Sequence, residues 1–181
     1  LWWIGFLVLT IASERLELSR VVRLSRRAVA MFSAEALLLL GSLAWTTIRN
    51  AVELRVLGAS LALLALWMLR CDVARRTIRL AGLPRFVASG LMAGYVWLLA
   101  GGVLFAWNAG AWGPFPRDAA YHCIFLGFVM SMIFAHAPII LPAVSGFGVT
   151  FSRAFYVPLF LLHATLALRV ASDGGAWMET R

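Results

Sequence analysis

Three histidines, each inside an apolar stretch, are the residues of this chain best suited to chemistry. They are His122, His136 and His163, and the 181-residue chain holds no other histidine. An ionisable side chain is costly inside a lipid-facing helix unless it pairs with another group, ligates a metal or lines a wet cavity. The histidines are therefore the first candidates for ligands of a metal ion or a haem iron.

The spacing of the candidates suggests one shared site. His122 and His136 fall on one predicted helix, about 21 Å apart along its axis and within about 40° of the same face. Counted from the ends of their own helices, Glu35, His136 and His163 lie at a similar depth, roughly 9 to 13 Å from one membrane surface. We therefore predict a metal site of Glu35, His136 and His163, or a haem b held by His136 and His163. His122 is a third candidate ligand, although solvation near the other surface explains it more simply.

Structural roles compete with these assignments. A membrane histidine can bond to a carbonyl or hydroxyl group on a neighbouring helix, and a membrane glutamate can relay protons or pair with an arginine. Pro138 and Pro142 remove two helix donors after His136 and are expected to kink or unwind that helix end. Arg169 is expected to snorkel or to pair with Asp173. No phosphate-binding loop, zinc-type cysteine pair or nucleophile elbow occurs in the sequence.

The elements that must position these residues are long apolar helices. The chain is 62% hydrophobic and 13% charged, with a mean hydropathy of +0.89, whereas soluble domains are nearer half apolar and a quarter charged. We expect an all-α, polytopic helical bundle in a membrane, as one domain over residues 1–181, with about six transmembrane helices, the first of them truncated. The expected spans are 1–13, 28–48, 52–69, 86–107, 119–144 and 155–170.

The charge pattern indicates an orientation rather than nucleic-acid binding. All 16 basic residues are arginine and the net charge is +8, but the arginines gather between apolar segments. The positive-inside rule places the Arg-rich loops 14–27 and 70–85 in the cytoplasm of a bacterial inner membrane. Cys71 and Cys123 then lie near opposite surfaces, so they cannot form a disulfide. Gly90 and Gly94 are spaced for close helix contact.

The run from Tyr121 to Ile140, YHCIFLGFVMSMIFAHAPII, resembles one found in multi-pass bacterial membrane proteins. It is also similar to the NnrS group of haem- and copper-containing membrane proteins, over the fifth and sixth spans only. This resemblance implies His122, His136 and His163 as ligands.

The sequence leaves three functions open. The first is a membrane redox or metal- or haem-binding protein, such as an electron-transfer subunit of a larger complex. The second is a structural or assembly subunit without a cofactor, and the third is a transporter or channel. The expected partners are the lipid bilayer and other membrane subunits, not nucleic acid.

Overall fold

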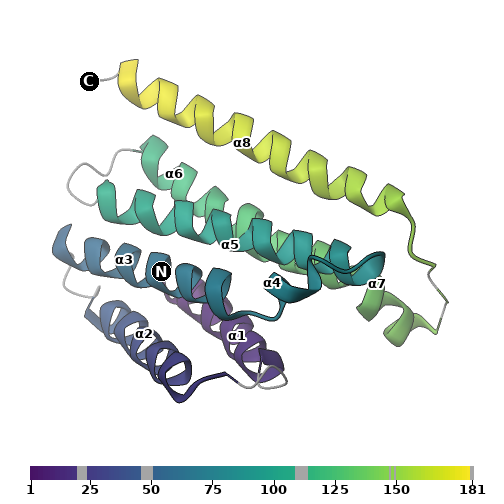
Figure 1. Ribbon diagram of the computed structural model, residues 1–181. Coiled ribbons are helices and arrows are strands. Elements are labelled where there is room, and N and C mark those ends of the chain that lie inside the picture. The colour runs from purple at the N-terminus through teal and green to yellow at the C-terminus, as the bar shows by residue number, and fades with distance from the viewer. Residues whose placement is uncertain (20–23, 46–50, 109–113, 147, 149, 180–181) are drawn as a thin grey trace.

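The computed structural model consists of helices joined by short turns and connections in the residues that it describes, which are 1–19, 24–45, 51–108, 114–146, 148 and 150–179 (Figure 1). The elements are α1 (Trp2–Ser19), α2 (Arg26–Trp45), α3 (Ala51–Cys71), α4 (Ala74–Thr77), α5 (Leu83–Trp107), α6 (Pro114–His122), the π-helix η3 (Cys123–Val129), α7 (Met130–Ser145), the 3-10 turn η4 (Arg153–Phe155) and α8 (Tyr156–Glu179). The predicted all-α class is confirmed for these residues.

Five helical segments are long and apolar enough to cross a membrane. They are Arg26–Trp45, Ala51–Cys71, Leu83–Trp107, Arg117–Ser145 and Arg153–Asp173. These segments agree with five of the expected spans, because hydropathy alone determines where such helices lie. The predicted end of the second span, residues 46–48, lies outside the described residues.

The first helix differs from its prediction. The segment expected at 1–13 is helical, but α1 runs on to Ser19 and includes Glu14, Arg15 and Glu17. With these charges it is not among the five candidate spans, so the described chain has five rather than about six. Arg15 consequently lies within a helix and not in a basic loop.

Helices α3 and α5 form the central pair of the bundle. Their contact is the most extensive between any two elements described, and α1 and α2 pack beside α3. Helix α6, η3 and α7 pack along α5, and α8 lies along the edge of the bundle beyond α6 (Figure 1). In the apolar stretch of α3, 50% of the residues are buried, whereas in that of α8 only 11% are buried. Helix α8 therefore depends on few contacts for its position.

Glycines allow the central helices to approach closely. A Cβ atom on Gly58 of α3 would lie 2.4 Å from the backbone N of Ala106 and 2.5 Å from the carbonyl of Gly102. On α5, a Cβ atom on Gly90 would lie 2.9 Å from that of Ala135, and one on Gly94 would lie 2.6 Å from Met132 Cε. The predicted packing role of Gly90 and Gly94 is confirmed.

The irregular part of the long fifth span is not where the prolines lie. Helix α7 stays α-helical through Pro138 and Pro142 to Ser145, so the predicted unwinding does not occur. The π-helix η3 lies earlier in the span, where Gly127 packs against Trp97 of α5. A π-helical turn holds more residues than an α-helical one and rotates the rest of the helix about its axis. The rotation explains why His122 and His136 face different helices, contrary to the prediction of one shared face.

The glycine contact between α3 and α5 gives a test of the packing. Replacing Gly58 with Ala places a methyl group against the α5 backbone, which cannot move aside as a side chain would. We expect a loss of about 1–3 kcal/mol of stability and an apparent unfolding midpoint in mild detergent that is lower by several degrees. The control is Gly41→Ala on α2, where nothing lies within 4 Å of the new methyl group. Equal midpoints for the two variants would contradict the close α3–α5 contact.

Candidate functional site

The predicted ligands do not converge. Glu35 lies on α2, which packs against α1 and α3, whereas His163 lies on α8, which packs mainly against α6 and η3. His136 lies on α7 and contacts α1. Equal depth along separate helices does not make those helices neighbours, and the structure therefore does not assemble Glu35, His136 and His163 into one ligand set. Haem binding by His136 and His163 stays a prediction.

His163 is held by a tryptophan. The indole Nε1 of Trp97 donates a hydrogen bond to His163 Nδ1 over 3.0 Å. An indole N–H can only donate, so Nδ1 is the acceptor and a neutral ring carries its proton on Nε2. A metal-ligating histidine normally has the opposite arrangement, in which the second ring nitrogen donates to a neighbouring group. Trp97 thus occupies His163 Nδ1, and His163 Nε2 is buried with no hydrogen-bond partner among the described residues.

His136 belongs to a buried polar network centred on an ion pair. Arg15 of α1 contacts Asp72, which directly follows α3, through Nε to Oδ2 at 2.9 Å and Nη2 to Oδ1 at 3.3 Å. The two side chains are only 6% and 0% exposed. Tyr95 of α5 donates to Asp72 Oδ2 at 3.1 Å, and the backbone N–H of Ala74 donates to Oδ1 at 2.6 Å. Arg15 Nη1 also donates to His136 Nε2 at 3.4 Å.

This network keeps Arg15 charged. Burial alone would lower the pKa of the guanidinium. The hydrogen bond to Asp72, with the electrostatic effects of Tyr95 and Asp72, raises the pKa of Arg15 above its ordinary value instead. His136 completes the set, with Nε2 lying 3.4 Å from Arg15 Nη1 and Nδ1 lying 2.8 Å from the carbonyl of Met132. A metal cation at His136 would have to lie beside this guanidinium, which disfavours it.

Sequence reasoning misses most of this network. The charge pattern places Arg15 in a basic loop, and it singles out neither Asp72 nor Tyr95. One signal is present, since Asp72 is the only acidic residue between Glu53 and Asp118 and stands within the Arg-rich stretch 70–85. A lone carboxylate among arginines at a helix end could have indicated a buried partner.

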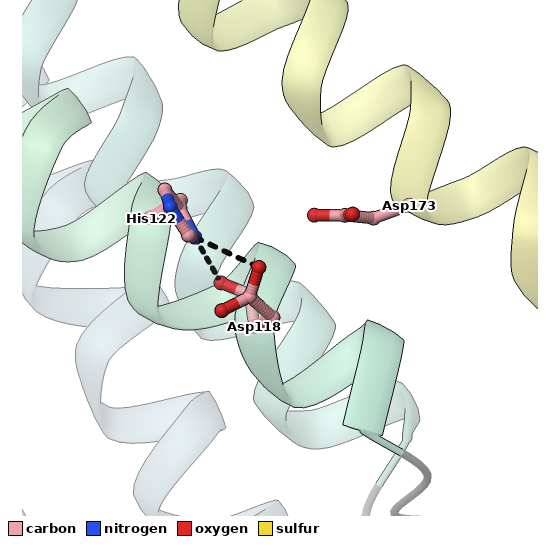
Figure 2. Close-up of side chains that lie close together, drawn as sticks. All are labelled: Asp118, His122 and Asp173. Atoms are coloured by element: carbon pink, nitrogen blue, oxygen red, sulfur yellow. Dashed lines mark hydrogen bonds and ion pairs between the residues drawn. The ribbon is translucent and has the colours of Figure 1, made fainter.

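A second polar cluster lies at the other end of the bundle, where α6 begins and α8 ends (Figure 1). Asp118 and His122 are one turn apart on α6, and His122 Nδ1 lies 2.8 Å from the carbonyl and 3.3 Å from Oδ2 of Asp118. Asp173 of α8 points toward both (Figure 2). Among the described residues, these three are the group of potential metal ligands that converge, with donor atoms all within 4.8 Å of one another.

One arginine connects the two carboxylates of this cluster. Arg169, one turn before Asp173 on α8, lies 2.8 Å from Asp118 Oδ2 through Nη2 and 3.4 Å from Asp173 Oδ1 through Nε. The predicted pairing of Arg169 with Asp173 is confirmed. Asp173 is 6% exposed, and its other oxygen, Oδ2, is buried with no hydrogen-bond partner among the described residues. A buried, unpartnered carboxylate oxygen is costly unless a further group binds it.

Cys71 and Cys123 are both free thiols, as predicted. Cys123 is buried directly after His122 but is not part of the converging group.

The buried ion pair can be tested by removing one partner. Replacing Arg15 with Met leaves Asp72 charged and unpaired in the interior, and we expect a loss of about 3–5 kcal/mol of stability. The double variant Arg15→Met/Asp72→Asn removes both charges and should recover part of that loss. Thermal unfolding in detergent measures both effects. Glu17→Gln, on the exposed side of α1, is the control and should change stability by less than about 1 kcal/mol. A single variant as stable as this control would show that the pair is not formed.

Comparison with known proteins identifies a family but no activity. No curated protein and no solved structure matches the chain, and the similarity to the NnrS group stays a prediction. A family model described as "Domain of unknown function (DUF8744)" matches residues 1–181. Because that match covers the whole chain, the protein belongs to the DUF8744 family.

Proposed function

We propose that this protein binds a divalent first-row metal ion in the membrane, through Asp118, His122 and Asp173. The convergence of these three donors from α6 and α8 is the observation that carries the proposal. One imidazole nitrogen and two carboxylate oxygens suit Zn²⁺ or Mn²⁺, and three protein ligands leave coordination positions for water or a substrate.

The charges of the cluster favour a cation. Asp118 and Asp173 supply two negative charges, and Arg169 balances one of them. Arg169 is about half exposed, with 55% of its side chain accessible, so it can turn toward solvent when a metal binds. The unpartnered Asp173 Oδ2 offers a ligand atom that needs no existing hydrogen bond to break.

The three histidines differ in their suitability as ligands. His163 accepts from Trp97, and His136 faces the guanidinium of Arg15, whereas His122 faces two carboxylates. His122 Nδ1 donates a hydrogen bond to the carbonyl of Asp118 over 2.8 Å. Coordination through Nδ1 moves that proton to Nε2, and because a ring protonated on both nitrogens cannot bind a metal, metal binding weakens in acid.

Helix α8 has little buried surface, and a metal bridging α6 and α8 would hold it in place. If the Arg-rich ends of α1 and α3 face the cytoplasm, as the charge bias predicts, the site faces the opposite side. Asp118 and His122 are partly exposed, with 41% and 28% of their side chains accessible. A bound ion could therefore exchange with that side or polarise a water molecule there.

Metal titration of the purified, metal-depleted protein in detergent tests the proposal. We expect the wild-type chain to bind one Zn²⁺ or Mn²⁺ ion by isothermal titration calorimetry, more weakly in acid. His122→Ala and Asp173→Asn should each weaken binding by at least about 100-fold, because loss of even a supporting residue around a metal costs 10 to 100-fold. The same titration should raise the unfolding midpoint of the wild type but not of His122→Ala.

The matched controls are His136→Ala and His163→Ala, which remove the other two imidazoles. Both should bind the metal like the wild type. If His136→Ala or Glu35→Gln abolished binding while His122→Ala did not, the ligands would be those predicted from depth, and the present assignment would be wrong. A wild-type chain that binds neither ion, but loses stability on Asp173→Asn, would make the cluster an ion-pair contact between α6 and α8.

A further inference from the structure

Four arginines line one pocket beside the Arg15–Asp72 ion pair, at the end of the bundle away from the proposed metal site. The pocket has a volume of about 500 Å³ and lies between the start of α2 and the region from the end of α3 to α4. Its basic residues are Arg70, Arg75, Arg76 and Arg79, and Ser25 and Asp72 also line it. The arginines are not scattered over a surface but share one concave space.

No acidic side chain on the wall of this pocket is free to pair with its arginines. Among the described residues, none of the four arginines forms an ion pair with an acidic side chain. Asp72 is the one acidic residue on the wall, and it is already bound by Arg15, Tyr95 and the N–H of Ala74. The four guanidinium groups are therefore available to bind an anion from outside the chain.

The donors of the pocket suit a phosphate. A guanidinium group offers a rigid fork of N–H donors that binds phosphate oxygens in pairs. Ser25 Oγ accepts the backbone N–H of Ala28 at 3.2 Å, so its own hydroxyl proton is free to donate. Helix α2 begins at Arg26, next to the pocket, and its positive N-terminal end adds to the attraction for an anion.

The place of the pocket favours a lipid over a free phosphate. It lies where three candidate spans end or begin, at Arg26, Cys71 and Leu83, which is the level of the lipid headgroups if these helices cross a membrane. Apolar side chains of α2 next to it, Val29 and Met31, are 38% and 55% exposed and can contact acyl chains. We propose that the pocket binds the phosphate headgroup of an anionic phospholipid.

The experiment is a lipid titration of the full chain in detergent, followed by native mass spectrometry. The probes are dioleoyl phosphatidylglycerol, dioleoyl phosphatidylcholine and inorganic phosphate. We expect the anionic lipid to bind at least tenfold more tightly than the zwitterionic one, and inorganic phosphate to compete only weakly because it lacks acyl chains. Cys71, which also lines the pocket, gives a second readout, since bound phosphatidylglycerol should slow its alkylation by N-ethylmaleimide.

Two double variants of equal charge separate this site from general electrostatics. Arg75→Gln/Arg79→Gln should weaken binding of the anionic lipid by about 30-fold, at roughly fivefold for each arginine. Arg55→Gln/Arg153→Gln removes the same charge at exposed positions outside the pocket and should leave binding within about twofold. The charge-preserving Arg75→Lys/Arg79→Lys variant should retain part of the affinity, which also shows that the chain still folds.

Equal binding of the two lipids, or equal losses in the two glutamine variants, would overturn the proposal. Tight binding of inorganic phosphate that displaces the lipid would overturn it as well, because the ligand would then be a free anion. None of these outcomes depends on whether a metal binds at the opposite end.

Discussion

The structure depends most on the buried ion pair between Arg15 and Asp72. Removing two charges from water is costly, and such a pair is tolerated only if the remaining donors and acceptors are satisfied. Here Tyr95, the N–H of Ala74 and His136 satisfy them. These contacts join α1, which is too charged to count as a span by itself, to α3, α5 and α7. They also occupy both carboxylate oxygens of Asp72 and the Nε2 atom of His136, so that neither side chain is available for other chemistry.

The two ends of the bundle consequently have opposite characters. At one end the ion pair neutralises Asp72, the acidic residue on the pocket wall, and leaves Arg70, Arg75, Arg76 and Arg79 unpaired around the pocket. At the other end Arg169 balances only one of two carboxylates, and a buried oxygen of Asp173 remains without a partner among the described residues. One end therefore presents guanidinium groups without an acidic partner, and the other presents a buried carboxylate oxygen without a partner among the described residues. Helix α8 has little buried surface, and the second cluster joins it to α6.

Sequence alone predicts the helices well but the site poorly, for separate physical reasons. Hydropathy determines which stretches can be long apolar helices, so five spans are placed within a few residues. The depth of Glu35, His136 and His163 is a property of each helix, whereas a ligand set requires helices to be neighbours. The π-helix η3 has no simple signature in sequence, and it rotates His136 away from the face of His122. Asp118 and Asp173 become candidates only when the packing of α8 on α6 is known.

We propose that a metal ion binds between α6 and α8 on one imidazole and two carboxylates. X-ray absorption spectroscopy of the zinc-loaded protein tests it most directly, because the outer-shell scattering of imidazole rings can be counted. The proposal predicts one imidazole and otherwise oxygen ligands at about 2.0–2.2 Å. Two imidazoles, or sulfur at about 2.3 Å, would contradict it and indicate other ligands, such as His136 and His163 or the cysteines.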